Sequence, residues 1–155
     1  SNAVKPFFNE AYGYAVFPKI GKAAYILGGA YGTGRVYKQG IITGTSVMKK
    51  MSLGFQIGAQ MFSQIIFFQD KRAYEDFTKE RFVFDGSFSA VVLTLGTQAH
   101  AGTRGSSAGA SIGPATGMQA KTEYHKGMAV FIHTLGGLMY EMAVSGQNFS
   151  FTPID

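Results

Sequence analysis

The sequence contains no cysteine and no tryptophan, and only four of its 155 residues are proline. Without cysteine there can be no disulfide framework, thiolate metal site or thiol nucleophile, and the chain is compatible with any redox compartment. No apolar run approaches the ~18 residues that a membrane-spanning helix needs. These absences exclude a disulfide scaffold, a cysteine-dependent enzyme and a transmembrane helix within this sequence.

Acidic residues are also scarce. Nine Asp and Glu residues accompany fourteen Lys and Arg residues, which gives a net charge of +5. Residues 1–60 hold seven of the bases and one acid, Glu10, whereas the rest of the chain is close to neutral. This asymmetry favours an acidic partner, such as phospholipid headgroups, nucleic acid or an acidic protein. The alternative is that the charge serves solubility alone.

Glycine and apolar residues are plentiful, with 21 glycines and 46% hydrophobic residues. Short apolar runs broken by glycine are typical of antiparallel β proteins. Residues 52–61 alternate strictly between apolar and polar side chains, and residues 65–68 are apolar on both faces. We therefore expect a mainly β (α+β) fold built on a strongly coiled antiparallel sheet or a barrel-like sheet.

One helix is expected near residues 71–80. Asp70 is a suitable N-cap, and Ala73, Tyr74 and Phe77 share one face at helical spacing. Residues 88–95 predict a further strand. The last third predicts a meander, with turns at 126–127, 136–137 and 145–146. Residues 96–117, rich in Gly, Ala, Ser and Thr, predict either a loop or small-residue strands.

The chain predicts a single domain over residues 4–155. Residues 1–3 (Ser-Asn-Ala) are typical of the remnant that a protease leaves after an affinity tag is removed. We therefore expect that the natural N-terminus, with any signal peptide or lipidation site, precedes this sequence.

The stretch Gly28–Tyr37, GGAYGTGRVY, resembles a phosphate-binding loop at first sight. The dinucleotide motif requires a third glycine where this chain has Tyr37, followed by a helix, but Arg35–Tyr37 has strand character. No Gly-Lys-Ser/Thr triplet occurs either. We predict that these glycines are structural and allow close approach, bulges or coiling of strands.

Catalytic and metal-binding patterns are weak. Gly105–Gly109 matches the G-x-S-x-G pattern with Ser107 as nucleophile, but Pro114 would block the helix that must follow. If residues 126–127 form a turn, His125 pairs with Met128 and lies far from His133 along the ladder. The third histidine is His100. A metal site would need a third ligand, and only Glu123 is near His125. We expect no catalytic residues, no metal site and no cofactor. The aromatic residues fit core periodicity, so nucleic acid is not favoured as a partner.

Several segments in order carry a family resemblance. The run Ala11–Ala23 (AYGYAVFPKIGKA), the glycine-rich Gly28–Gly34 and Gly54–Gln60 (GFQIGAQ) resemble successive motifs of the SYLF domain, also called the Ysc84 actin-binding domain family. The helix near Ala73–Phe77, the segment Gly86–Ala90 and the C-terminal hairpins follow in the same order. The resemblance extends from about Ala11 to the C-terminus.

The resemblance implies a non-enzymatic lipid-binding module. Eukaryotic members bind phosphoinositides and, in some cases, actin filaments, whereas bacterial members are mostly short, exported proteins and often lipoproteins. Without a second domain, this chain resembles the bacterial type, which implies a location in the periplasm or cell envelope. The alternative is a protein-interaction or scaffolding module of the envelope, with residues 96–117 as a contact surface.

The early bases are the candidate lipid-binding residues, because bases at turns can gather at one rim of a sheet and meet a headgroup phosphate. Lys22 ranks first because the resemblance includes it, and Lys19 and Arg35 follow. The full set is Lys19, Lys22, Arg35, Lys38, Lys49 and Lys50. For each of them the alternative is an ordinary solvated base.

Overall fold

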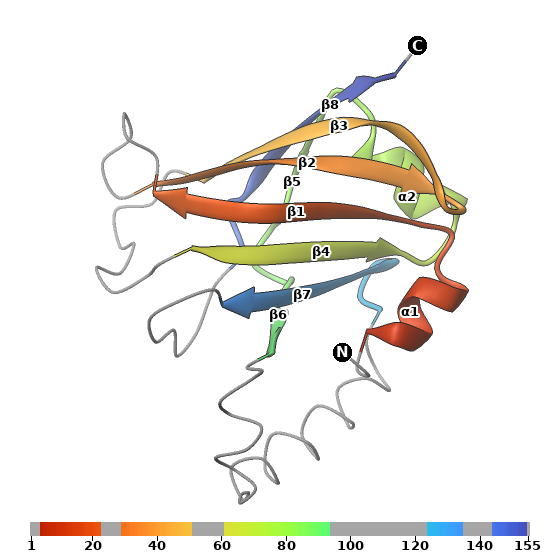
Figure 1. Ribbon diagram of the computed structural model, residues 1–155, viewed down its shortest axis with the longest axis horizontal. Helices are drawn as coiled ribbons and strands as arrows, with labels where there is room; N and C mark the ends of the chain where they lie inside the picture. The colour runs from red at the N-terminus through yellow and green to blue at the C-terminus, as the bar shows by residue number, and fades with distance from the viewer. Residues whose placement is uncertain (1–3, 23–28, 51–60, 94–123, 135–143, 155) are drawn as a thin grey trace, which may run out of the picture.

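The computed structural model describes residues 4–22, 29–50, 61–93, 124–134 and 144–154, whose arrangement Figure 1 shows. Within these ranges, eight strands form one sheet and two short helices pack against it. The elements are α1 (Lys5–Glu10), β1 (Gly13–Lys22), β2 (Ala30–Lys38), β3 (Ile41–Lys50), β4 (Phe62–Phe68), α2 (Lys71–Phe77), β5 (Arg81–Val83), β6 (Ala90–Leu93), β7 (Met128–Thr134) and β8 (Asn148–Pro153). The mainly β fold is confirmed. The sequence analysis predicts a single helix, near residues 71–80, and α1 is an additional helix that it does not predict.

The sheet has the strand order β5-β8-β3-β2-β1-β4-β7-β6 and is curled into a half-barrel. In Figure 1, β8 and β5 pass behind β2 and β1, so the two edges of the sheet turn toward the same side. Every pairing is antiparallel except β6–β7, which is parallel. The curl gives the sheet an inner face that encloses the main core and an outer face.

A bulge at Pro18 sits in β1, a central strand of the sheet. Proline cannot donate to a ladder, so a central strand tolerates it only where the pairing is interrupted. The register slips between Val16 and Lys19 on the β2 side and between Phe17 and Ile20 on the β4 side. Because of this extra residue, Phe17 and Ile20 both point into the core, whereas Lys19 is exposed.

The inner face holds the larger apolar core. Phe17 from β1 packs on Phe149 from β8 with ring centroids 5.4 Å apart, and Phe149 packs on Phe77 of α2 at 5.1 Å. Phe84, just after β5, lies 5.4 Å from Phe149. Helix α2 and the strands that curl behind the sheet therefore close this core.

The apolar cluster of the outer face is centred on β4, β7 and β6. There Phe7 of α1 lies 5.3 Å from Phe67 and 5.0 Å from Phe131. Strand β4 is therefore buried on both faces, with Ile66 and Phe68 in the inner cluster and Phe67 in the outer one. The two-sided burial predicted for residues 65–68 is confirmed.

The glycines of β2 allow the strands to pack closely. A Cβ on Gly34 would lie 2.5 Å from the Val16 carbonyl oxygen and 2.6 Å from the Phe17 ring, and one on Gly32 would lie 2.6 Å from the Ile20 side chain. Residues 30–38 are strand, so no helix follows the glycines as a phosphate loop requires. Their predicted structural role is confirmed for Gly32 and Gly34.

Two predicted local signals are confirmed. The Asp70 carboxylate accepts a hydrogen bond of 3.0 Å from the Ala73 backbone N–H, and α2 ends at Phe77, three residues before the predicted end. His125 and Met128 exchange backbone hydrogen bonds around a turn in which Lys126 and Gly127 have positive φ. The predicted strand at 88–95 begins two residues later, as β6 covers Ala90–Leu93, and residues 94–95 lie outside the described ranges.

Other expectations fall outside the described residues. These are the alternating strand at 52–60, the segment 96–117 with Ser107, His100, and the middle strand of the C-terminal meander. Strands β7 and β8 flank that middle segment but are not neighbours, because β7 lies between β4 and β6 and β8 lies between β3 and β5. Neither described helix is long and apolar enough to cross a bilayer.

Candidate functional site

The outer face of β1, β2 and β3 is mixed and exposes several polar side chains, unlike that of β4. On β2, burial alternates strictly from Ala30 to Val36, so Tyr31, Thr33 and Arg35 are exposed on the outer face. Strand register places Thr33 beside Lys19, which the Pro18 bulge turns outward, and Tyr31 beside Lys49. Three exposed bases therefore lie on one face of three adjacent strands.

This face extends across β8 to β5, where Arg81 pairs with Ser150 and Ser150 with Val47. We call the outer surface of β5, β8, β3, β2 and β1 the outer basic face, with the bases Lys19, Arg35, Lys49 and Arg81. None of these five strands contains Asp or Glu. A surface with bases and without acids on its strands has a positive potential that attracts anions.

Two exposed apolar side chains border the bases at one end of this face. Tyr31 is 36% and Met61 43% exposed. Met61 lies beside Gly21, with its Cγ 3.3 Å from where a Cβ on that glycine would be. Gly21 pairs with Tyr31 across β1 and β2, and Tyr31 pairs with Lys49. We call the set Lys19, Tyr31, Lys49 and Met61 the basic rim.

Lys22 and Lys50 end their strands at the same pole but occupy inner-face register positions, because both pair with Ala30, which is buried. Lys50 is half-buried, and desolvation lowers the pKa of its ammonium group below the usual value. The side chain of Lys22, the first-ranked candidate, lies outside what the structure describes.

The remaining two candidates lie elsewhere. Arg35 is midway along β2 on the outer face. Lys38 ends β2 at the opposite pole, where it pairs with Gly13 and Ile41 and its ammonium lies 5.9 Å from the Tyr74 ring centre. The expected gathering of the bases at one rim therefore does not extend to Arg35, which lies midway along its strand, or to Lys38, because antiparallel strands place successive turns at opposite ends of a sheet.

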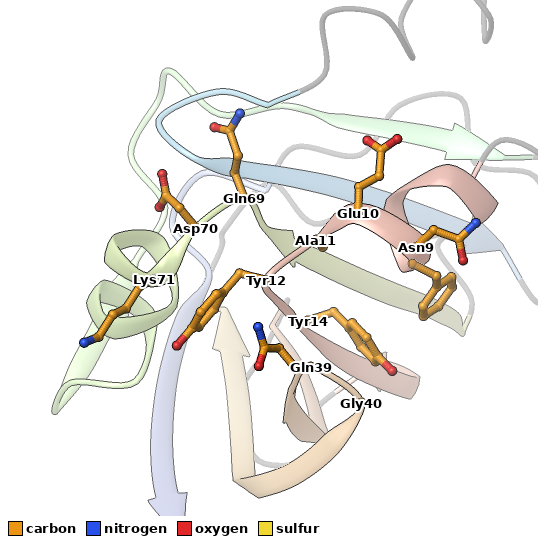
Figure 2. Close-up of a pocket in the computed structure, with 11 residues that line it drawn as sticks. Asn9, Glu10, Ala11, Tyr12, Tyr14, Gln39, Gly40, Gln69, Asp70 and Lys71 are labelled. Atoms are coloured by element: carbon orange, nitrogen blue, oxygen red, sulfur yellow. The ribbon is translucent and has the colours of Figure 1, made fainter.

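At Lys38's pole, an open groove of about 740 Å³ lies between α1, the β2–β3 turn and the start of α2 (Figure 2). Its lining is mixed aromatic and polar: Phe8, Asn9, Glu10, Ala11, Tyr12, Tyr14, Gln39, Gly40, Gln69, Asp70 and Lys71. This groove was not predictable from the sequence, because its residues come from separate turns that only the fold brings together.

A second polar cluster joins the turn after β5 to the turn before β7. Ser87 donates to Asp85 through both its hydroxyl and its backbone N–H, and Lys126 lies 3.2 Å from the same carboxylate. The Ser87 hydroxyl and Lys126 lower the pKa of Asp85 to about 2. His125 Nε2 lies 2.9 Å from the Ser87 hydroxyl oxygen.

This cluster does not have the order of a hydrolase triad. In a triad the carboxylate orients the histidine, which in turn activates the serine. Here Asp85 binds the Ser87 hydroxyl itself, so that hydroxyl proton is already engaged by the carboxylate. Among the described residues, no three His, Asp or Glu side chains lie close enough together to hold a metal ion.

The family comparison decides the identity of the domain. A family model, described as Ysc84: Las17-binding protein actin regulator, matches residues 49–151. The chain belongs to the Ysc84 (SYLF) family. Domains of this family are known for actin binding and lipid binding. The match contains Lys49, Met61 and Arg81, whereas Lys19 and Tyr31 precede it. No curated protein matched the chain.

Proposed function

We propose that this Ysc84 domain is a non-enzymatic module that binds anionic phospholipid headgroups at a membrane surface through its basic rim. The observation that carries the proposal is the placement of two exposed lysines, Lys19 and Lys49, beside the exposed side chains of Tyr31 and Met61. A membrane surface offers phosphate oxygens for the bases and an apolar boundary for the other two side chains.

The free energies expected for these contacts suit reversible binding. Each base near an anionic leaflet contributes about 1 kcal/mol, and the attraction falls off within a Debye length of about 8 Å at physiological salt. Lys19 and Lys49 would form the first contact, and Arg35 and Arg81, on the same outer basic face, would add longer-range attraction. The proposed binding is therefore salt-sensitive, with a smaller salt-insensitive part from Tyr31 and Met61.

The proposal extends to phosphoinositide-like headgroups because of Lys22 and Lys50. Both strands end at the same pole, on either side of Ala30. Contact with a phosphate would favour the charged form of Lys50, whose desolvation otherwise disfavours it. A membrane-facing rim also suits the exported, envelope-associated location that the resemblance implies.

The test is co-sedimentation with vesicles of phosphatidylcholine alone, with phosphatidylserine, or with a phosphoinositide at matched total charge. Replacing Lys19 and Lys49 together by Gln removes two bases, about 2 kcal/mol, so we expect about thirtyfold weaker binding to the anionic vesicles. Tighter binding to the phosphoinositide at equal charge would support the headgroup site, and equal binding would indicate charge attraction alone.

Lys38→Gln is the positional control, because it removes one base from the opposite pole, whereas the double variant removes two from the basic rim. We expect it to bind anionic vesicles like the unmodified protein. An equal loss for Lys38→Gln and for the double variant, or failure of the unmodified protein to bind anionic vesicles at any salt concentration, would contradict the proposal.

A second candidate function is protein binding, which the family's description as an actin regulator favours. The outer basic face offers a broad surface without acids on its strands, which suits an acidic filament. Co-sedimentation with actin filaments separates the candidates: binding to filaments without binding to anionic vesicles would replace the lipid proposal by a protein-interaction module.

A further inference from the structure

The outer basic face repeats one local arrangement, in which a base lies directly opposite a side chain that can donate a hydrogen bond. These base–donor pairs are Lys19–Thr33, Arg35–Thr45, Lys49–Asn148 and Arg81–Ser150. Residues paired in this way on a sheet have Cβ atoms about 5 Å apart, so both members of a pair can reach the same anion. All four bases of the outer basic face belong to such a pair, and three of the four donors are hydroxyls.

The side chains of the base–donor pairs have no partner within the described part of the chain. None of them forms a hydrogen bond or an ion pair with another described residue. Other bases differ, since Lys71, Lys79 and Lys126 each form an ion pair with a carboxylate. The bases and donors of the outer basic face are therefore available to an external anion.

A base beside a hydroxyl or an amide suits a phosphate group. The oxygens of a phosphate point in several directions, so one group can accept from the base and from its donor at the same time. Lys, Arg, Ser, Thr and Asn are also the side chains that contact phosphate oxygens where proteins bind nucleic acid backbones. Each base–donor pair therefore fits one phosphate.

The base–donor pairs are spread over a convex surface. Lys19–Thr33 and Ser150–Arg81 lie at one level of the sheet, joined through Val47. This row crosses five strands, so its ends are about 19 Å apart along the sheet. Figure 1 shows β8 and β5 passing behind β2 and β1, and the outer side chains at the two ends of the row therefore point in different directions. A flat bilayer or a rigid filament can contact only part of this surface at one time, whereas a flexible chain can follow its curvature.

The aromatic residues of the face favour a chain without bases to stack. Single-stranded nucleic acid binds tightly where successive bases stack on exposed rings. Tyr14 and Tyr37 instead stack on each other, with ring centroids 5.1 Å apart. Among the described tyrosines of this face, that leaves Tyr31 as the exposed ring. A polymer whose affinity comes from its phosphates alone fits this surface better.

We propose that the outer basic face binds inorganic polyphosphate, which wraps across β1, β2, β3, β8 and β5. The phosphates of one chain occupy successive base–donor pairs, and its flexibility lets it turn around the half-barrel. The inference does not rest on lipid binding, because it requires Arg35 and Arg81, which lie outside the basic rim. Lys19 and Lys49 belong to both surfaces, so polyphosphate should compete with anionic vesicles.

The experiment is isothermal titration calorimetry with long-chain polyphosphate and with tripolyphosphate at several salt concentrations. We expect Arg81→Gln to weaken binding of the long chain about fivefold to tenfold and to lower its salt slope by about one, since one phosphate contact is lost. Ser150→Ala should weaken it about threefold, through the loss of one hydrogen bond. Tripolyphosphate is too short to cross five strands, so its weaker binding should hardly respond to Arg81→Gln.

Arg72→Gln is the matched control, because it removes the same side chain and charge from the exposed surface of α2. It should bind the long chain like the unmodified protein, and circular dichroism shows whether each variant is folded. Arg81→Gln should keep most of its binding to anionic vesicles, so failure of this proposal and failure of the lipid proposal are distinguishable.

Three results would overturn the polyphosphate proposal. The first is that long-chain polyphosphate does not bind. The second is an equal loss for Arg81→Gln and Arg72→Gln, which would mean that net charge alone acts. The third is tighter binding of polyglutamate or oligothymidine at matched charge, which would make the partner an acidic polypeptide or a nucleic acid.

Discussion

At the scale of single residues, a few positions determine whether the strands can pack as they do. Gly34 of β2 lies directly beside Val16 and Phe17 of the neighbouring strand β1. Gly44 of β3 lies just as close to Phe151 and Thr152 of β8. At these sites the absence of a Cβ permits the close approach of neighbouring strands, and the curl of the sheet depends on it. Gly32 and Gly34, within the glycine-rich residues 28–34, therefore have a steric explanation.

Gly34→Ala should lower the free energy of unfolding by about 2 kcal/mol, because the added methyl group overlaps the Val16 carbonyl and the Phe17 ring. Urea unfolding followed by circular dichroism measures this. Gly86→Ala is the control, since nothing lies within 4 Å of a Cβ there. Equal stability of the two variants would show that the β2 glycines are not needed for strand packing.

At the scale of elements, local sequence signals predicted the helix and the strand whose features lie within a few neighbouring residues. The Asp70 cap and the face formed by Ala73 and Phe77 predicted α2, and the apolar run at 65–68 predicted a strand buried on both sides. Helix α1 was missed because its burial comes from Phe7 packing on β4 and β7, far along the chain. The parallel β6–β7 pair was also missed, because it joins two strands that lie far apart in the chain.

The candidate site was predictable only in part. Charge counting along the sequence identified Lys19, Lys49 and Arg35, which share the outer face. It could not separate Lys38 from them, because the end of the sheet at which a base lies depends on strand order. The alternating pattern of residues 52–61 had placed Met61 on the apolar face, whereas its side chain is 43% exposed. Strand register was needed to place Tyr31 and Met61 beside the bases.

A hydrogen-bonded amide pair joins two distant elements inside the core. Gln64 of β4 and Gln147, just before β8, exchange two side-chain hydrogen bonds of 2.8 and 3.0 Å, and both residues are fully buried. Replacing Gln64 by Leu should cost about 1–3 kcal/mol in the free energy of unfolding, because the amide of Gln147 remains buried without its partner.

The double variant Gln64→Leu/Gln147→Leu should recover part of that loss, since no unpaired amide remains. A double-mutant cycle from urea unfolding curves measures the coupling. Additive losses from the two single variants would contradict the claim that these side chains stabilise the core as a pair.

At the scale of the whole molecule, the two candidate sites lie at opposite ends of the central strands. The ten residues of β1 span about 30 Å, with the groove near its start and the basic rim near its end. The groove end also exposes Ile41 (68%) and Ile154 (49%). If the rim meets a membrane, the groove faces away from it.

The orientation at the membrane tests the central claim most directly. Anionic bicelles carrying a nitroxide-labelled lipid broaden the NMR signals of residues close to the bilayer. If the basic rim meets the bilayer, we expect strong broadening at Lys19, Tyr31, Lys49 and Met61, and little at Gln39, Ile41 and Ile154. Broadening centred on the groove end, or spread evenly over both poles, would contradict it.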